Sequence, residues 1–350
     1  MMKLPIIAVR ELILSLWRRI RFGPVDPAWS WRTSTMRDVL AALTDEVITV
    51  PPWVVPLLNR FIISGTPLSL GQVIRLGKAD LDGVYSDVLT RPQSDLTTVL
   101  FLHGGAYLVG SPKFVRQITS WLTWTLRART FAINYRLAPR HPFPAALEDA
   151  LTAYRWLLDH GVDPRTIVVM GDSAGGGLTV ALLVAAREEG LPLPAAGVCL
   201  SPWTDMTASG GTMETNAATD YLPPTKIPQA VAMVVGDADP TDPRVSVVNA
   251  DLTGLPPLQV FAGGNEVLLD SISAFVDKAR ASGVAVDYVI EPHMFHDWLT
   301  VLPGSVASML TMERIADFVS TIVERDLVRR RKHPQRLDAA VEAVADTPPR

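Results

Sequence analysis

Short apolar runs recur along the chain from about residue 95, and most are separated by segments with helical spacing. The runs are four or five residues long, as expected for strands buried on both faces, and cover 99–102, 130–134, 167–170, 197–200, 258–262 and 286–290. Amphipathic or apolar helical patterns cover 114–128, 145–159, 178–187 and 271–282. This alternation predicts an α/β fold, with a mostly parallel central sheet and helices on both of its faces.

Two stretches interrupt the alternation. Residues 1–90 carry helical patterns broken repeatedly by proline, and residues 205–250 are rich in Thr, Pro and Asp. We expect a core formed by 91–204 and 251–325, with the segment 1–90 and the insertion 205–250 contributing to a helical cap. Residues 326–350 contain a basic run at 329–332 followed by a stretch rich in Ala, Asp and Pro, which predicts a poorly ordered polar tail.

The charge balance limits the possible partners. A net charge of −4 and an isoelectric point near 5.9 argue against nucleic acid, which requires a basic binding face. The single cysteine, Cys199, lies in an apolar run and excludes an internal disulfide. This composition fits a reducing compartment, so we expect a cytoplasmic protein, and a homo-oligomer remains open.

The N-terminal segment is apolar but does not read as a membrane span. Arg10 and Glu11 interrupt the apolar stretch 4–20, and no small-residue cleavage site follows it. Apolar residues at 9, 12, 13, 16, 17 and 20 follow helical spacing, with several arginines on another side. The pattern predicts an amphipathic helix that either docks on the protein or makes peripheral contact with a membrane.

A serine follows one of the predicted strands in the sequence Gly-Asp-Ser-Ala-Gly, residues 171–175. A sharp turn between a strand and a helix lifts such a serine clear of the sheet, and small residues are needed two positions before and after it. Gly171 and Gly175 occupy those positions, and a helical pattern follows. The motif indicates that Ser173 is a nucleophile; the alternative is a glycine-rich turn holding an ordinary serine.

A nucleophilic serine requires a histidine as base and a carboxylate to orient that histidine. In doubly wound hydrolases the acid and the histidine follow later strands, in that order. Glu266 and Asp270 follow the run 258–262, and His293 and His296 follow the run 286–290.

Backbone N–H groups are also needed to bind the oxyanion of the tetrahedral intermediate. Gly104 and Gly105 come directly after the first predicted strand of the core. The N–H of Ala174, the residue after the serine, would complete the set.

Four segments together resemble the hormone-sensitive-lipase family of carboxylesterases. They are His-Gly-Gly-Ala-Tyr at 103–107, Tyr-Arg-Leu-Ala-Pro at 135–139, residues 141–149, and Gly-Asp-Ser-Ala-Gly-Gly at 171–176. The resemblance covers about 95–325 and implies an α/β-hydrolase fold with a helical cap. It also implies hydrolysis of carboxylic esters without a metal or cofactor, and an oxyanion hole formed by Gly104, Gly105 and Ala174.

The family spacing favours Glu266 over Asp270 as the acid and His296 over His293 as the base. By the same resemblance, His103, Asp149 and Asp172 are structural supports.

The chain departs from the family pattern in three places. Where many members carry an aspartate as the acid, the family spacing puts Glu266 in this chain. Ala106 replaces the usual third glycine of the oxyanion loop, and we expect its methyl group to narrow the pocket. The usual His-Gly-Phe is replaced by the segment 293–298, in which His296 is followed by Asp297 and Trp298.

The sequence therefore predicts a serine carboxylesterase acting on small-molecule esters of short to medium chain length, with Ser173, His296 and Glu266 as its triad. Two alternatives stay open at this stage. One is a non-catalytic small-molecule receptor on the same fold, and the other is an amidase or acyl-transfer enzyme that uses the same three residues.

Overall fold

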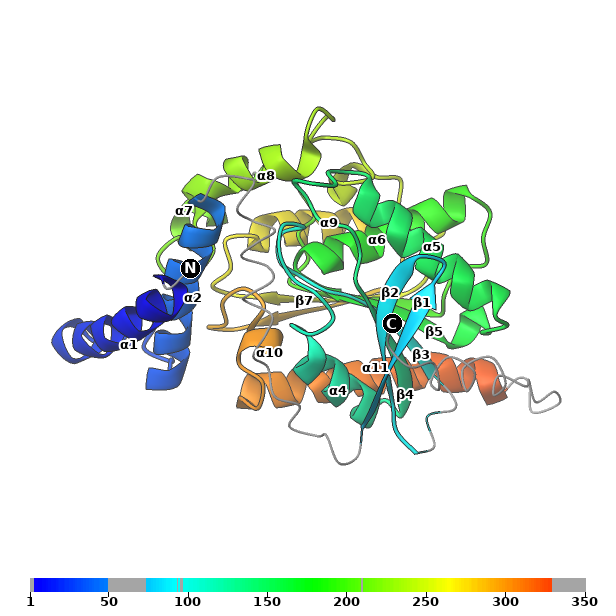
Figure 1. Ribbon diagram of the computed structural model, residues 1–350, viewed down its shortest axis with the longest axis horizontal. Coiled ribbons are helices and arrows are strands. Elements are labelled where there is room, and N and C mark those ends of the chain that lie inside the picture. Colours follow the sequence, from blue (N-terminus) through cyan, green and yellow to red (C-terminus); the bar gives the residue numbers. More distant parts are fainter. Residues whose placement is uncertain (1–2, 50–73, 93, 95–96, 209, 329–350) are drawn as a thin grey trace.

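The structure is a computed structural model that describes residues 3–49, 74–92, 94, 97–208 and 210–328. Its centre is an eight-stranded sheet with the strand order β1-β2-β4-β3-β5-β6-β7-β8 (Figure 1). The strands are β1 (Arg75–Leu81), β2 (Val84–Thr90), β3 (Thr97–Leu102), β4 (Ala128–Ile133), β5 (Ile167–Asp172), β6 (Ala196–Leu200), β7 (Leu258–Gly263) and β8 (Val286–Glu291).

Six neighbouring strands run parallel: β4, β3, β5, β6, β7 and β8. At one edge of the sheet β2 pairs antiparallel with β4, and β1 pairs antiparallel with β2. Every residue of β3, β5, β6 and β7 is buried, because helices cover both faces of the sheet. The predicted α/β-hydrolase architecture, with its mostly parallel sheet, is confirmed.

Helices form a layer on each face. On one face α5 (Ala145–Asp159), α6 (Ala174–Glu188) and α9 (Leu269–Ala281) pack into the larger core cluster. On the other face α4 (Arg116–Thr125) and α11 (Val306–Val328) pack into the second cluster, next to the short α10 (Trp298–Val301). The strands thus end between two packed layers, and the loops at their carboxyl ends are held in place from both sides.

The structure corrects three expected boundaries. Residues 75–90 form β1 and β2 of the sheet, so the core begins before residue 91. The helix expected over 114–128 ends at Thr125, because Arg127 has a positive φ and Ala128 starts the buried strand β4. Residues 326–328 complete α11, which was not predicted, and the rest of the expected tail lies outside the described residues.

Apart from η3 (Pro164–Thr166), which immediately precedes β5, the remaining elements lie at the end of the sheet where the parallel strands finish. They are α1 (Lys3–Phe22) and α2 (Trp31–Thr49) from the N-terminal segment, and α7 (Thr212–Thr215), η4 (Pro224–Lys226), α8 (Ile227–Val235) and η5 (Val247–Asn249) from the insertion 205–250. The helix α2 contacts η4, and Arg37 of α2 donates to the carbonyl of Ala218. Figure 1 shows α1 and α2 projecting from the body next to α7.

Candidate active site

Ser173 stands in a sharp turn between β5 and α6. Its backbone has φ +54° and ψ −119°, a conformation that residues other than glycine rarely adopt. The flanking glycines make the turn possible: a Cβ at Gly171 would lie 2.2 Å from the carbonyl oxygen of Gly175, and one at Gly175 would lie 1.9 Å from that of Leu102. The requirement for glycine at both positions, inferred from the motif, is confirmed.

The structure brings Ser173, His296 and Glu266 together in a line. His296 Nε2 lies 2.8 Å from Ser173 Oγ, and His296 Nδ1 lies 3.2 Å from Glu266 Oε2. All three side chains are buried. They come from the loops after β5, β8 and β7, which meet at the same edge because these strands are parallel.

The second oxygen of the Glu266 carboxylate is fixed by two donors. Oε1 accepts from the backbone N–H of Gly263, at 2.6 Å, and from the hydroxyl of Ser201. The hydroxyl oxygen of Ser201 in turn accepts the N–H of Asp297, at 3.1 Å. These bonds leave Oε2 as the oxygen directed at the histidine.

A further carboxylate, Asp220 of the insertion, supports the same loops. It accepts the N–H of His296 at 3.2 Å through Oδ1 and the N–H of Val267 at 2.8 Å through Oδ2. Burial raises the pKa of Asp220 to about 6, despite the nearby charge of His296. Tyr221, the next residue, lies with its ring 5.7 Å from that of His296. Neither residue was predicted from the sequence.

The environment favours a charged form of His296. Burial lowers the pKa of the imidazole, but the hydrogen bond that its Nδ1–H donates to Glu266 and the negative charges of Glu266, Asp220 and Asp172 outweigh this effect. The net result is a pKa above the ordinary value of 6.5. A histidine held in this way accepts a proton from a serine readily and keeps its charged form stable while it holds that proton.

The two alternative residues have other partners. Asp270 is exposed and accepts the N–H of Thr212 at 3.0 Å, so it does not reach His296. His293 is 57% exposed on its side chain, and its Nδ1 lies 2.9 Å from Asp26 Oδ2. The geometry therefore favours Glu266 and His296.

Asp26 and Trp29, in the connection between α1 and α2, join the N-terminal segment to both loops. Asp26 Oδ2 also accepts the side-chain amide of Asn265 at 2.8 Å. The indole N–H of Trp29 donates to the carbonyl of His293, and its ring packs edge-on against Phe295, with 5.5 Å between centroids. The contacts hold the loops of the acid and the histidine from the solvent side.

The predicted oxyanion loop needs one correction. The N–H of Gly104 donates to Asp172 Oδ1 at 2.9 Å, so it is already occupied and does not face a substrate. Glycine is required there for another reason, since a Cβ would lie 2.5 Å from Asp172 Oδ2. Gly105 has a φ of +111°, and Ala174 is the first residue of α6, where a backbone N–H has no acceptor within the helix.

His103 supports this loop from within the core. It is buried, stacks on Tyr135 with 4.2 Å between ring centroids, and its Nδ1 lies 2.7 Å from the carbonyl of Gly104. Burial lowers the pKa of His103 to about 4, which keeps the ring neutral. Asp149 accepts the backbone N–H of Arg136 at 2.7 Å and pairs with its guanidinium. These contacts are those expected of structural supports.

Asp172 and Asp297 form a buried pair of carboxyl groups beside the serine turn. As carboxylates, their atoms Asp172 Oδ2 and Asp297 Oδ1 have no hydrogen-bond partner among the described residues. Burial raises the pKa of both groups, and that of Asp297 most strongly because Asp172 also repels its charge. A proton on Asp297 that is donated to Asp172 satisfies both oxygens.

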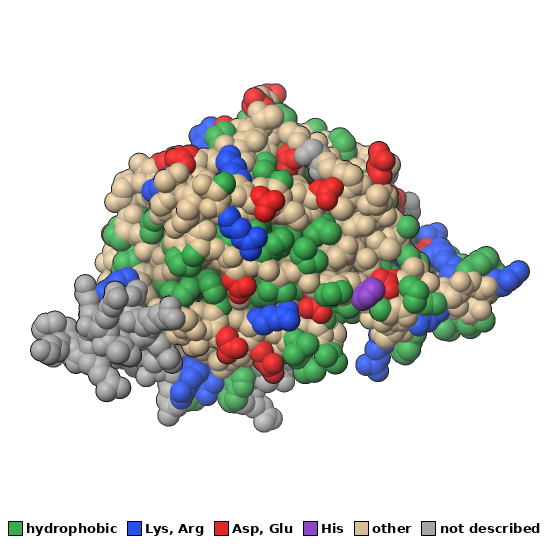
Figure 2. Space-filling model, turned by 180° about the vertical axis from the view of Figure 1, so that it is seen from behind, with side chains coloured by type: hydrophobic (Ala, Val, Ile, Leu, Met, Phe, Trp, Pro, Cys, Tyr) green, Lys and Arg blue, Asp and Glu red, His purple; other side chains and the backbone are tan. Residues whose placement is uncertain are grey.

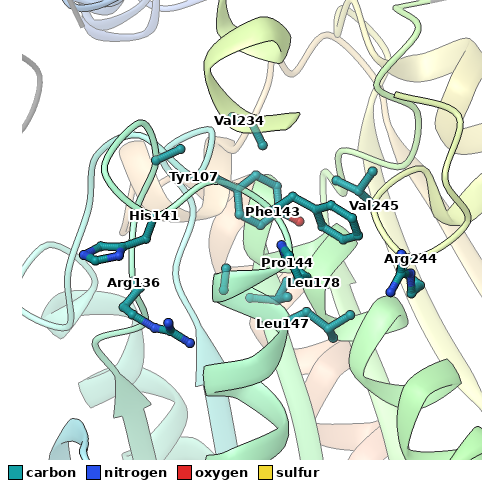
Figure 3. A pocket seen from close by; sticks show the side chains of 12 residues that line it. Tyr107, Arg136, His141, Phe143, Pro144, Leu147, Leu178, Val234, Arg244 and Val245 are labelled. Atoms are coloured by element: carbon teal, nitrogen blue, oxygen red, sulfur yellow. The ribbon is translucent and has the colours of Figure 1, made fainter. Parts of the chain in front are cut away.

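A small pocket lies beside α6, next to the oxyanion loop (Figure 3). Its interior volume is about 20 Å³, which is room for little more than one water molecule. Tyr107, Phe143 and Val245 point toward one another across it, while Arg136 and Arg244 lie on opposite sides. This is far below the roughly 300–1,000 Å³ of ligand pockets, and none of Ser173, Glu266 and His296 lines it. In the described part of the chain, no three His, Cys, Asp or Glu side chains are grouped to hold a metal ion.

Comparisons with known proteins identify the family of this fold. A family of proteins with the α/β-hydrolase fold matches residues 99–300. The chain belongs to this family. An acetyl-hydrolase of Streptomyces hygroscopicus is 42% identical over 230 residues, which is 65% of this chain and 75% of that protein.

Solved structures indicate the branch of the family. An esterase of the bacterial hormone-sensitive lipase family matches with a TM-score of 0.75 and 38% identity, over 82% of this chain and 98% of its own. The esterase EstE5, soaked with p-nitrophenyl butyrate, matches with a TM-score of 0.74 and 34% identity, over 81% and 98%. The hydrolase is therefore a carboxylesterase of the hormone-sensitive-lipase type, as its sequence motifs predict.

Proposed function

We propose that this carboxylesterase works through an acyl-enzyme formed on Ser173, with His296 as general base and Glu266 as the carboxylate that orients it. The observation that carries the proposal is the 2.8 Å contact between His296 Nε2 and Ser173 Oγ, with Glu266 on the opposite ring nitrogen. Such a contact is within the range in which a proton can be transferred.

The reaction proceeds in two halves. Ser173 Oγ attacks the ester carbonyl carbon as its proton passes to His296 Nε2, and the oxyanion is held by the N–H groups of Gly105 and Ala174. The C–O bond to the alcohol then breaks, and His296 protonates the departing alcohol. A water molecule, deprotonated by His296, attacks the acyl carbonyl, and the carboxylic acid leaves as Ser173 regains its proton.

We further propose that the preferred esters have short to medium acyl chains. The side chain of Ala106 adds a methyl group at a position with φ +54° in the oxyanion loop. The related proteins named above include an acetyl-hydrolase and an esterase that was soaked with a butyrate ester. All of these features support small acyl groups.

A series of p-nitrophenyl esters from acetate to palmitate tests the proposal. We expect kcat/KM to be highest for acetate to hexanoate and to fall steeply toward palmitate. Equal rates on emulsified long-chain triglyceride and on soluble butyrate would refute the chain-length part. Matched p-nitroanilides distinguish an amidase, and binding of esters without any turnover would indicate a receptor instead.

A further inference from the structure

The helix α1 has its polar side against the protein and its apolar side toward solvent. Among its described side chains only Glu11 and Ser15 are buried. Ser15 Oγ lies 3.5 Å from Thr35 Oγ1 of α2, and Arg18 pairs with Glu11 and with Asp38 of α2. The amphipathic helix does pack on the protein, as one of the two predicted alternatives states. The face of α1 that contacts α2 is the polar one.

The outward face of α1, which we call the apolar stripe, is extensive. Its members are between 47% and 79% exposed: Val9, Leu12, Ile13, Leu16, Trp17 and Ile20. The stripe spans about 17 Å along the helix. Phe22, Val25 and Trp31 continue it around the connection to α2, and each is also exposed. Continuous exposed apolar surface of this kind marks an interaction site.

The charges around the apolar stripe are mostly positive. The hairpin of α1 and α2, residues 3–49, holds one lysine, six arginines and five carboxylates, a net charge of +2 in a chain whose total is −4. Glu11, Asp26 and Asp38 are buried, whereas Asp45 of α2 is exposed. Four arginines are exposed: Arg10 and Arg18, which pair with Glu11, and Arg21 and Arg32. Figure 2 shows hydrophobic and basic side chains gathered on this projection, at the right of the view.

Two of these arginines lie against aromatic rings of the same surface. The guanidinium carbon of Arg21 is 5.5 Å from the ring centre of Phe22, and that of Arg32 is 5.8 Å from the ring centre of Trp31. An apolar helical face bordered by arginine and aromatic residues is typical of helices that lie in the interface of an anionic bilayer. No helix in the described part of the chain is both long and apolar enough to cross a membrane.

We propose that α1 docks this protein on the surface of an anionic lipid membrane, with the apolar stripe in the interface and the arginines among the headgroups. The docked surface is at the active-site end of the sheet, because Trp29 and Asp26 of the same hairpin contact the loops of His293 and Asn265. Membrane contact therefore brings ester molecules held in the bilayer near the catalytic loops. The docking itself does not depend on the proposed reaction.

Flotation of the full-length protein with vesicles tests the proposal. We expect binding to phosphatidylcholine vesicles that contain about a third phosphatidylserine, and much weaker binding to pure phosphatidylcholine. Replacing two stripe residues, Ile13→Glu with Ile20→Glu, should abolish flotation. The matched control, Val306→Glu with Leu310→Glu, alters exposed apolar residues of α11 and should bind normally.

The charge contribution has its own pair of variants. Each basic residue near an anionic surface is worth about a fivefold change in partition, so Arg21→Gln with Arg32→Gln should lower binding about 30-fold. Arg75→Gln with Lys78→Gln, on the exposed edge strand β1, should leave it unchanged. Hydrolysis of soluble p-nitrophenyl butyrate shows that each variant is folded.

Two results would overturn the proposal. One is equal flotation of the wild-type protein and the stripe variant. The other is a dimer in the absence of lipid that the Ile13 and Ile20 substitutions convert to a monomer, because the stripe would then be the contact between two copies of the chain. Sedimentation velocity without vesicles distinguishes the second case.

Discussion

Replacing Glu266 by glutamine should invert the hydrogen bonding of the catalytic histidine. In the wild-type protein Oε1 accepts from the N–H of Gly263, which can only donate, and from the hydroxyl of Ser201. Ser201 donates here because an ionised carboxylate oxygen has no hydrogen to give, and its own oxygen accepts the N–H of Asp297. The oxygen of the glutamine amide therefore has to remain at this position, and its NH₂ group has to face His296 Nδ1.

The consequence is a histidine in the wrong tautomer. With Nδ1 accepting from the glutamine, Nε2 carries the hydrogen, points it at Ser173 and can no longer take the serine's proton. The equivalent change in a chymotrypsin-type serine protease, from aspartate to asparagine, lowers kcat about 10⁴-fold, or about 5.4 kcal/mol of activation free energy, and we expect a loss of this size. The shapes of glutamate and glutamine are nearly equal, so the melting temperature should change little.

The assay is kcat/KM for p-nitrophenyl butyrate across pH. Because the reaction needs neutral His296, whose pKa is raised above 6.5, wild-type activity should increase with pH and reach half its plateau above pH 6.5. Glu266→Gln removes the hydrogen bond and the charge that raise this pKa, so its residual activity should reach half-plateau at lower pH. Asp270→Asn is the control and should resemble the wild type. A folded Glu266→Gln protein that keeps more than roughly a tenth of kcat would refute the reasoning.

Two further substitutions test the neighbouring groups. His296→Ala should lower kcat about 10³-fold or more, whereas His293→Ala should cost far less; the opposite ranking would identify His293 as the base. Asp297→Asn should change the pH dependence of stability. Because the folded-state pKa of Asp297 is raised, the wild-type fold loses stability as pH increases above 3.8, the value for an unperturbed aspartate. Asparagine cannot ionise and can still donate to Asp172, so the variant should melt higher than the wild type at pH 8 but not at pH 4, and equal melting curves at both values would contradict the shared proton.

The buried parallel strands were predictable because each is a continuous apolar run between helical patterns. The antiparallel edge was missed, since β1 and β2 mix Lys, Asp and Ser with their apolar residues. A signal for them was present: Asp82 and Gly83 both have positive φ in the two-residue turn between the strands, and Asp-Gly is a strong hairpin dipeptide.

The candidate site was predictable where a residue lies in the loop that follows a core strand. This applies to Ser173, Glu266 and His296, and Ser201 could have been found in the same way, since it comes directly after β6. Asp220 could not, because it reaches the histidine from an insertion without periodic pattern. The occupied N–H of Gly104 depends on how two loops approach each other, which spacing along the chain does not determine.

The most direct test of the account is covalent labelling with a p-nitrophenyl alkylphosphonate, followed by peptide mapping with mass spectrometry. The account predicts one adduct per chain, on Ser173, with complete loss of esterase activity. It also predicts that Ser173→Ala takes up no label and has lost activity about 10³-fold or more. An adduct on another side chain, or a folded Ser173→Ala protein that still hydrolyses p-nitrophenyl butyrate at close to the wild-type rate, would contradict it.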